Sequence, residues 1–429
     1  MKPIELVIVG AGNRGDCYAK LALRKPEKLR IVGLVDPSQV RLDLMREKYG
    51  VPEENCFHSL EEFLARDKFA DGVINGTMDQ LHVQTTVPVL EKGYDVLLEK
   101  PFCVNEDELW ELKEAADRTG RRVMICHVLR YTPFYSAIKK KILEGEIGEV
   151  ISIQMAEHVS YHHFGVSYIR GKWANESECG SPIILAKCSH DLDLMMWMNG
   201  GKKPVSVASF GSDYQFRPEN KPNGAGNHCM IDCPAEVEGE CLFSCRKNYL
   251  EPELHWQQYV CRELEGGEIS YDTVKAWLQN PENNFGRCVW DCKHDVVDHQ
   301  AVIVNFENGT TGTFTLVGAQ PRAERKIHIA GTKGEIKGVF EDSKFVIRKA
   351  APNNTFVETE IDLNVTGDMS GEYGGHGGGD QRLSEDFVDM LMGQQPSISC
   401  TALADSLYSH LTAFRAEKAR KNKTVEPVF

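Results

Sequence analysis

The first part of the chain alternates short apolar runs with segments whose apolar residues recur every three or four positions. The first pattern is typical of strands buried in a sheet, and the second is typical of helices that cover it. Strand, helix and strand at this spacing predict a parallel sheet covered on both faces. One domain over residues 1–127 accounts for all of these elements. The predicted strands cover residues 4–9, 29–35, 71–75, 96–98 and 123–126, and the predicted helices begin near residues 14, 59, 81 and 105.

After about residue 132 the pattern changes to a helix over residues 133–144 and then to longer strands. Asn308-Gly309, the strongest short hairpin signal, lies between two such strands. We therefore expect a second domain over residues 128–429, of α+β class, with a large, open and mainly antiparallel sheet. Because an open sheet often becomes an interface between subunits, we also expect a homo-oligomer, a dimer or a tetramer. Other predicted elements are the strands at 150–157, 301–306, 311–317, 326–330 and 335–340, a glycine-rich loop at 371–379, and helices near 381–392 and 402–419.

The turn after the first strand contains Gly10, Gly12 and Gly15 in the pattern G-x-G-x-x-G. In a dinucleotide-binding unit the first glycine permits a tight turn, the second lets a pyrophosphate approach, and the third lets the helix pack closely. The amides at the start of the next helix then face the phosphates, where the helix dipole favours an anion. A second predicted strand ends in Asp36, 21 residues after the last glycine, where a carboxylate binds the adenosine ribose. This context predicts NAD binding rather than a plain glycine turn.

Two later segments carry residues suited to proton transfer. Glu99-Lys100-Pro101 follows a predicted parallel strand at the sheet edge where α/β folds bind ligands, so the Lys100 ammonium could bind a substrate hydroxyl. Lys187, His190 and the acids at positions 191 and 193 lie on adjacent turns of a predicted helix and can share one face. His190 suits a general base because the ordinary histidine pKa is about 6.5. A solvated lysine and a satisfied core histidine are the structural alternatives.

The charge balance restricts the partners of the chain. Its 49 basic and 63 acidic residues leave a net charge of −14, which argues against nucleic acid and anionic membranes because both require a basic face. No apolar run is long enough to span a membrane, and the first strand begins without a preceding secretory signal. We therefore expect a cytoplasmic protein whose 14 cysteines are reduced thiols.

Six cysteines fall within 64 residues as three C-x3-C pairs. Such a density is compatible with a zinc or iron–sulfur site, or with buried thiols in a packed insertion. The spacing differs from a C-x2-C knuckle, and six thiols exceed the four that one ion needs, so we assign no metal ligands. The cysteines are those at positions 229, 233, 241, 245, 288 and 292.

Several motifs, taken in order, are similar to those of one known family. After the glycine turn come Asp36-Pro37, Glu99-Lys100-Pro101, Arg130-Tyr131-x-Pro133 and a Ser-His-Asp-x-Asp that begins at Ser189. In order and spacing they resemble the glucose–fructose oxidoreductase and inositol dehydrogenase family (Gfo/Idh/MocA) over nearly the whole chain. The resemblance implies an N-terminal Rossmann domain that binds NAD(P) and a C-terminal α/β domain with an open sheet. It also implies a small carbohydrate or polyol substrate in the cleft between them.

The resemblance also assigns residues to roles. Lys100 matches the motif lysine and His190 the catalytic histidine, while Thr77, Met78 and His82 resemble a loop near the nicotinamide ribose. The cofactor-binding residues are then Gly10, Gly12, Asn13, Arg14, Gly15, Asp36, Thr77, Met78, His82, Glu99, Lys100 and Arg130. The substrate-binding residues are Lys100, Tyr168, Arg170, Trp173, His190 and His376.

The chain departs from the family pattern just before His190. The family often has Asp-x-Gly-x-His, whereas this chain has Ala186-Lys187-Cys188-Ser189-His190 and lacks the acid. We expect Lys187 to be a third catalytic residue, which lowers the pKa of His190 by like-charge repulsion. Arg170, Trp173 and His376, in segments typical of a branch with poorly defined substrates, are expected to shape the sugar pocket.

Together these observations indicate an NAD-dependent oxidoreductase that moves a hydride between the nicotinamide and a secondary alcohol of a sugar, glycoside or cyclitol. Two alternatives stay open. One is a glycoside-cleaving enzyme that retains NAD and oxidises the sugar transiently, and the other is a non-catalytic NAD-binding regulatory protein. Lys100 favours simple redox chemistry because the related glycosidases have Glu-x-Pro without the lysine. Intact Lys100 and His190 argue against the non-catalytic interpretation.

Overall fold

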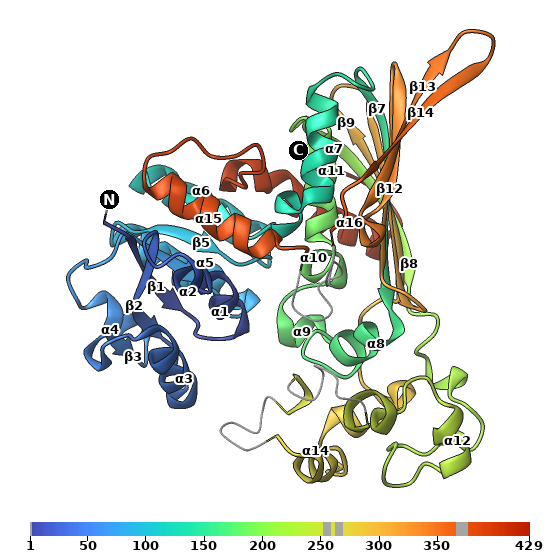
Figure 1. Ribbon diagram of the computed structural model, residues 1–429. Coiled ribbons are helices and arrows are strands. Elements are labelled where there is room, and N and C mark those ends of the chain that lie inside the picture. Colours follow the sequence, from blue (N-terminus) through green and yellow to red (C-terminus); the bar gives the residue numbers. More distant parts are fainter. Residues whose placement is uncertain (1, 252–258, 262–268, 366–375) are drawn as a thin grey trace.

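Two sheets organise the chain, one on each side of Figure 1. The structure is a computed structural model that describes residues 2–251, 259–261, 269–365 and 376–429. A six-stranded sheet contains the N-terminal strands, and a nine-stranded sheet contains the later ones. This arrangement confirms the predicted α/β fold class, with a Rossmann-like parallel sheet and a large, mainly antiparallel sheet. Part of the predicted glycine-rich loop, residues 371–375, lies outside the described residues.

All strands of the first sheet run parallel, in the spatial order β3-β2-β1-β4-β5-β6. The order reverses between β1 and β4, and open α/β sheets bind ligands at such a point, outside the carboxyl ends of the strands. The central strands are apolar and buried because helices cover both faces. The strands are β1 (Ile4–Val9), β2 (Leu29–Val35), β3 (Cys56–Phe57), β4 (Gly72–Asn75), β5 (Asp95–Leu98) and β6 (Val123–Ile125). The helices are α1 (Asn13–Ala19), α2 (Leu21–Arg24), α3 (Gln39–Tyr49), α4 (Leu60–Leu64), α5 (His82–Glu91) and α6 (Glu106–Thr119).

Local signals place most of these helices where the sequence predicts them. Ser59 and Asn105 each accept a hydrogen bond from the backbone amide three residues on, and so begin α4 and α6. One prediction differs from the structure. The helix expected to begin near residue 14 is divided into α1 and α2 at Lys20, whose carbonyl accepts a hydrogen bond from the Leu23 amide, only three residues later, at 3.2 Å.

The second sheet has the spatial order β14-β13-β12-β11-β7-β10-β9-β8-β15, and its described neighbours are antiparallel except β7 and β10. The predicted hairpin at Asn308-Gly309 joins β9 to β10, and Gly309 has a φ of 82°, which favours glycine. Three helices, α7 (Pro133–Leu143), α11 (Ser189–Met198) and α16 (Leu403–Asn422), cover one face of the sheet (Figure 1). The strands are β7 (Val150–Ser160), β8 (Pro204–Ser212), β9 (His299–Phe306), β10 (Thr311–Gln320), β11 (Glu324–Gly331), β12 (Gly334–Val339), β13 (Lys344–Ala351), β14 (Thr355–Asp362) and β15 (Val425–Pro427).

Helix α15 (Gly379–Leu391) returns from the second sheet to the first. It packs on α1, α2 and the short helix η3 (Val128–Tyr131), and its Leu383 and Phe387 lie in the same apolar core as β1. On its outer side Glu385 forms an ion pair with Lys28 of the N-terminal segment. A segment near the C-terminus therefore completes the covering of the N-terminal sheet.

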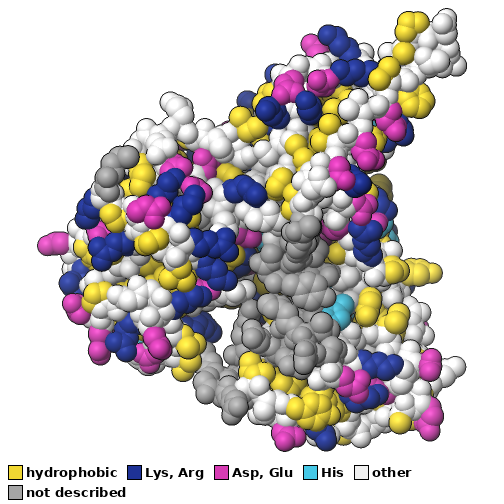
Figure 2. Space-filling view, in the orientation of Figure 1, with side chains coloured by type: hydrophobic (Ala, Val, Ile, Leu, Met, Phe, Trp, Pro, Cys, Tyr) yellow, Lys and Arg dark blue, Asp and Glu magenta, His cyan; other side chains and the backbone are white. Residues whose placement is uncertain are grey.

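An insertion of residues 213–298 separates β8 from β9 and carries half of the 14 cysteines. It contains α12 (Ala235–Glu240) and α14 (Tyr271–Leu278), which lie along the bottom of Figure 1. Figure 2 shows acidic and basic side chains interspersed over this face of the molecule. Among the helices of the described residues, none is both long and apolar enough to cross a membrane. Three short helices, α8 (Tyr161–Phe164), α9 (Glu176–Cys179) and α10 (Ile183–Ala186), precede α11.

Arg130 holds η3 to α11. Its Nε donates to Asp193 Oδ2 at 2.7 Å, its Nη2 to Asp193 Oδ1 at 2.5 Å, and its Nη1 to the Cys400 carbonyl at 3.1 Å. Both members of this bidentate pair are buried. This corrects the expectation that Arg130 binds the cofactor, because its guanidinium is engaged with these interior partners.

We predict that Arg130→Gln lowers the free energy of unfolding by about 3–5 kcal/mol, because it leaves the Asp193 carboxylate buried without its cation. Urea denaturation measures this change. Adding Asp193→Asn should recover part of the loss, since the neutral amide no longer needs a cation. As a control, Lys344→Gln removes an exposed ion pair with Asp362 and should change stability by less than about 1 kcal/mol. A similarly small effect of Arg130→Gln would contradict the prediction.

Candidate active site

The three motif glycines differ in what surrounds them. A Cβ on Gly10, whose φ is 86°, would lie 2.7 Å from the backbone of Gly76, and a Cβ on Gly15 would lie 2.5 Å from the Gly10 carbonyl oxygen. A Cβ on Gly12, in contrast, would meet no atom within 4 Å. The first and third glycines are therefore required by chain packing, while the second leaves open space beside the start of α1. That space and the uncapped helix start fit a pyrophosphate.

Asp36 joins the end of β2 to this turn. Its Oδ2 accepts a hydrogen bond from the Ala11 amide at 2.9 Å, and its Oδ1 accepts one from the Ser38 amide, also at 2.9 Å. The Arg41 guanidinium lies 3.5 Å from Oδ1. The carboxylate is therefore held beside the glycine turn, where its free lone pairs suit ribose hydroxyls.

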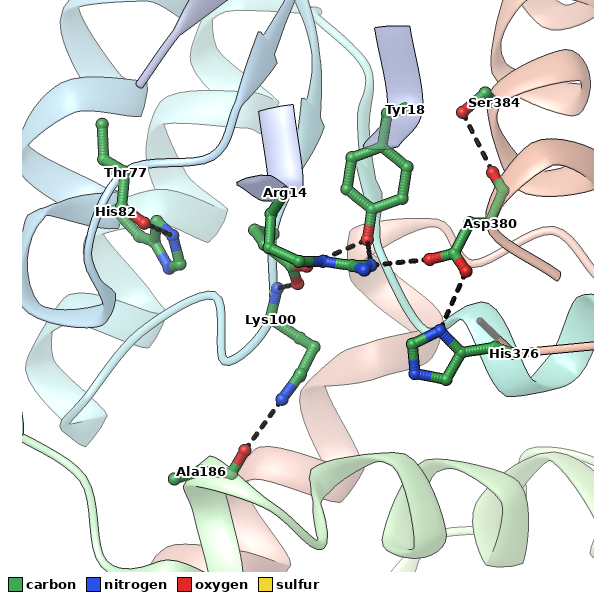
Figure 3. Close-up of polar contacts among 10 residues, drawn as sticks. Arg14, Tyr18, Thr77, His82, Lys100, Ala186, His376, Asp380 and Ser384 are labelled. Atoms are coloured by element: carbon green, nitrogen blue, oxygen red, sulfur yellow. Dashed lines mark hydrogen bonds and ion pairs between the residues drawn. The ribbon is translucent and has the colours of Figure 1, made fainter. Parts of the chain in front are cut away.

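Lys100 lies at the carboxyl end of β5, before a cis peptide bond to Pro101. Its Nζ donates a hydrogen bond to the Ala186 carbonyl oxygen at 2.8 Å (Figure 3). Burial lowers the pKa of Lys100 below its ordinary value, although Glu99 and Asp79 act in the opposite direction. Ala186 stands where the family often has an acid, so the Lys100 ammonium meets a backbone carbonyl there instead of a carboxylate. It keeps two N–H groups for other acceptors.

His190 is placed by a break between α10 and α11. Its ring centroid lies 5.8 Å from that of His127 and 6.3 Å from that of His376. Burial and then the Lys100 charge hold the pKa of His190 well below 6.5, so the imidazole is neutral at physiological pH. Within the described part of the chain its buried Nδ1 has no hydrogen-bond partner. The ring can therefore accept a proton.

Lys187 does not act on His190 as the sequence analysis expects. The helix break turns its side chain toward β7, where Nζ lies 3.3 Å from Glu157 Oε1. Burial and Lys100, rather than Lys187, dominate the lowered pKa of His190. Glu157 also pairs with Arg325 of β11 at 2.5 Å, so Lys187 belongs to a buried ionic cluster on the second sheet.

Arg14 connects the glycine turn to two buried carboxylates (Figure 3). Its guanidinium donates to Glu99 and Tyr18, and Nη2 donates to Asp380 Oδ1 at 2.7 Å. Burial raises the pKa of Glu99 and Asp380, but nearby cations outweigh it and keep both pKa values below the ordinary range. Both carboxylates are therefore ionised.

Each carboxylate in turn positions a residue of the site. Glu99 Oε2 accepts a hydrogen bond from the Lys100 amide at 2.5 Å, and Asp380 Oδ2 contacts His376 Nδ1 at 2.8 Å. The sequence analysis missed Tyr18, Asp380 and the buried His127. The spacing of four between His376 and Asp380 was the one available signal, although the contact forms across the turn that precedes α15, which begins at Gly379.

The loop after β4 is tied to the lysine turn by His82. Its Nδ1 lies 2.7 Å from the Pro101 carbonyl oxygen, and its Nε2 lies 3.2 Å from the Thr77 carbonyl oxygen. The Thr77 hydroxyl bonds Asn75 Oδ1 at 2.9 Å. His82 thus supports the shape of the loop, with both ring nitrogens directed at backbone carbonyls. Met78 lies in the same loop, with its sulfur 3.3 Å from Lys172 Nζ.

The segment from Tyr168 to Trp173 lies against this loop. The two aromatic ring centroids are 6.2 Å apart, and Trp173 Nε1 donates to Asp79 Oδ2 at 3.3 Å. Arg170 points the other way. Its guanidinium lies in the insertion, which corrects the expectation that it shapes the sugar pocket. Across the described residues, no group of three or more histidine, cysteine or acidic side chains is arranged to hold a metal ion.

Two family models match the chain. Residues 4–127 match the oxidoreductase family's NAD-binding Rossmann fold, and residues 139–426 match its C-terminal alpha/beta domain. The chain belongs to the Gfo/Idh/MocA oxidoreductase family. The predicted family and NAD as its cofactor are thereby confirmed.

Two relatives of the chain illustrate the range of named proteins that it resembles. YteT of Bacillus subtilis (strain 168), which is named as an oxidoreductase without a stated substrate, is 26% identical over 376 residues, which are 85% of this chain and 83% of YteT. An inositol 2-dehydrogenase of Corynebacterium glutamicum is 24% identical over 207 residues, 48% of this chain and 57% of that protein.

Solved structures share the whole architecture. A scyllo-inositol dehydrogenase from Lactobacillus casei, with bound NAD(H) and scyllo-inositol, has a TM-score of 0.67 at 16% identity and covers 100% of this chain and 99% of its own. An NAD-binding oxidoreductase from Klebsiella pneumoniae has a TM-score of 0.71 at 15% identity, with coverage of 100% and 99%. Because these structures share only 15–16% sequence identity with the chain, their similarity establishes its fold alone.

We predict that the protein binds NAD more tightly than NADP and that Asp36→Asn narrows this gap. The asparagine oxygen still accepts the Ala11 amide but no longer repels a 2′-phosphate. Calorimetric titration of both dinucleotides measures the ratio. Asp43→Asn, on the exposed side of α3, is the matched control and should leave the ratio unchanged. Equal affinities in the unaltered protein would contradict the prediction.

Proposed function

We propose that this Gfo/Idh/MocA member catalyses the NAD-dependent interconversion of a secondary alcohol and a ketone on a carbohydrate or cyclitol. One observation carries the proposal: Lys100, at the carboxyl edge of the parallel sheet, is close enough to His190 to lower its pKa, and the neutral imidazole has no Nδ1 partner among the described residues. Relatives named as inositol dehydrogenases support the choice of a polyol-like substrate.

Oxidation of a CH–OH group removes a hydride and a proton. When bound, NAD supplies the hydride acceptor. The protein must then take the hydroxyl proton, and His190 is suited to this because burial keeps its imidazole neutral. Lys100 would donate a hydrogen bond to the same oxygen and stabilise the negative charge that develops there.

The neighbouring residues would hold the rest of the substrate. Asp380 fixes the His376 ring, which faces His190 and can bind a second hydroxyl group. Tyr168 and Trp173 offer aromatic faces for the apolar side of a sugar ring. The ion pair between Lys187 and Glu157 would hold the α10–α11 segment against β7.

The His376–Asp380 pair also favours a second candidate, the transient oxidation and cleavage of a glycoside. Such a reaction needs a further acid–base group near the first, and the His190 and His376 ring centroids are 6.3 Å apart. Product analysis separates the two candidates. Release of an aglycone without net NADH supports cleavage, whereas a ketone with stoichiometric NADH supports simple oxidation. A non-catalytic NAD-binding protein would give neither product on a panel of sugars, glycosides and cyclitols.

We predict that Lys100→Met and His190→Gln each lower turnover roughly 10²–10⁴-fold while NAD affinity changes little. Each removes a proton-transfer or charge-stabilising group without touching the glycine turn. Stopped-flow absorbance of NADH measures turnover. Lys140→Met and His58→Gln, both exposed positions, are matched controls. Near-normal turnover in both site variants would refute the assignment.

The pH dependence gives an independent readout of these two groups. Because the pKa of His190 lies well below 6.5, oxidation should not show the usual histidine inflection near that pH. The Lys100 ammonium is present below its pKa and lost above it, and burial lowers that pKa below 10.5. As the pH rises, turnover should therefore fall with a midpoint below pH 10.5. The Lys100→Met variant should not show this fall.

We further propose that the uncovered face of the second sheet joins two copies of the chain. Phe210 of β8, Ile303 of β9 and Val425 of β15 are 62%, 53% and 67% exposed. They lie on adjacent strands, because Ala208 pairs with both Ile303 and Val425. None of the three helices on this sheet covers that side (Figure 1). An exposed apolar patch of this kind is typical of a subunit interface.

We predict that Phe210→Asp combined with Ile303→Asp converts the oligomer into a monomer, because two like charges cannot be buried at such an interface without partners. Size-exclusion chromatography with light scattering measures the mass. The control is Leu44→Asp. Leu44 is 64% exposed and lies on α3, which packs on the first sheet and not on the second. An unaltered protein that is already monomeric would refute this proposal.

A further inference from the structure

Arg170 projects from the segment beside the site into the cysteine-rich insertion. Its side chain is buried, with 3% of the residue exposed. The guanidinium donates hydrogen bonds to the Arg287 carbonyl at 2.8 Å, the Tyr249 hydroxyl at 3.2 Å and the Cys229 sulfur at 3.5 Å. The proposed reaction uses none of these contacts.

Among the described residues, the hydrogen-bond partners of this guanidinium include no carboxylate. Over the described ranges Arg170 forms no ion pair with a carboxylate, although a buried guanidinium is costly without an anion. A carbonyl cannot ionise, and burial raises the pKa of Tyr249 to about 12, so its hydroxyl stays protonated. Of the three acceptors, only the thiol of Cys229 can supply a negative charge near neutral pH.

Cys229 has the surroundings of a thiolate. Hydrogen bonding from the Cys245 thiol and the positive charge of Arg170 lower the pKa of Cys229 to about 6, against the effect of burial. The same hydrogen bond and burial raise the pKa of Cys245 well above its ordinary value, so this partner stays a thiol. Cys229 packs against the cluster that contains Cys245, and of the two thiols only that of Cys229 is ionised near neutral pH.

The two cysteines also differ in access. Cys229 is partly exposed, whereas Cys245 is buried in a small apolar cluster with Val166 and Tyr249, against which Cys229 packs. Of the two residues, Cys229 is therefore the more accessible to a small reagent from solvent. The Cys245 thiol stays buried in the cluster against which Cys229 packs. Reactive cysteines combine low pKa, a nearby cation and partial exposure in this way.

We propose that Cys229, Cys245 and Arg170 form a peroxide-reactive thiol pair, with Cys229 as the nucleophile and Cys245 as the resolving thiol. The site differs from the proposed alcohol oxidation in residues, chemistry and position. It gives the cysteine-rich insertion a role that requires no metal.

The chemistry requires only a hydroperoxide. The Cys229 thiolate attacks one peroxide oxygen, the O–O bond breaks, and the leaving oxygen takes a proton to give water from hydrogen peroxide. Cys229 is then a sulfenic acid. The Cys245 thiol loses its proton and attacks the Cys229 sulfur, so that an S–S bond forms and the hydroxyl leaves as a second water. In sum, two thiols are oxidised to a disulfide and one peroxide is reduced to two waters.

Alkylation of the full-length protein by iodoacetamide tests the thiolate. Peptide mass spectrometry follows each cysteine as a function of pH. The rate for Cys229 should level off above about pH 7, because the thiolate is the nucleophile and is fully formed there. The rate for Cys56, also partly exposed and with a pKa raised by burial, should still rise at pH 9.

Peroxide treatment tests the pair. An equimolar amount of hydrogen peroxide should join the peptides of Cys229 and Cys245 with loss of two hydrogen atoms. In Cys245→Ser the disulfide cannot form, and dimedone should trap a sulfenic acid at Cys229. Cys229→Ser should leave Cys245 reduced, and the matched control Cys56→Ser should behave as the unaltered protein.

Arg170 is tested through Cys229 rather than through activity. Arg170→Met should move the plateau of Cys229 alkylation to higher pH, and Arg170→Lys should restore part of the shift because it keeps a cation. Melting curves report whether each variant is folded, and the Cys245→Ser result stands if Arg170→Met is not. Parallel alkylation profiles for Cys229 and Cys56 overturn the proposal. Peroxide oxidation of other cysteines before Cys229, or reactivity of Cys229 only after a chelator removes a metal, also overturns it.

Discussion

The ion pairs of Arg14 with Glu99 and Asp380 determine the arrangement of the site. Each carboxylate is only 5% exposed, so it requires a cation, and Arg14 serves both from the glycine turn. The partners lie 85 and 366 residues away in the sequence. One guanidinium therefore joins the cofactor turn, the end of β5 and the start of α15.

Each of the two carboxylates positions one residue of the proposed active site through one further contact. Glu99 holds the Lys100 amide, and Asp380 holds the His376 ring (Figure 3). On one side of the site the acids are ionised and paired. On the other side burial keeps the His190 imidazole neutral and lowers the pKa of Lys100. In the proposed reaction, this separation would leave the His190 imidazole neutral as a base and the Lys100 ammonium with N–H groups for the substrate oxygen.

A second set of contacts fixes how the two sheets meet. Helix α15 covers the first sheet, while Arg130 ties η3 to Asp193 of α11, which packs on the second sheet. The same helix α11 carries His190 near its start. The position of the histidine relative to Lys100 therefore depends on contacts between segments that are distant in the sequence. Loss of such contacts would misplace the histidine without changing any residue of the site.

The sequence by itself determined the elements whose causes are local. The three glycines, the caps at Ser59 and Asn105 and the hairpin at Asn308-Gly309 each act within a few residues, so pattern alone located them. Tertiary structure decided where long side chains go. The break between α10 and α11 turns Lys187 away from His190 to Glu157, and Arg170 enters the insertion. A helical repeat describes one face of one helix, whereas a buried charge goes to whichever opposite charge the folded chain brings near.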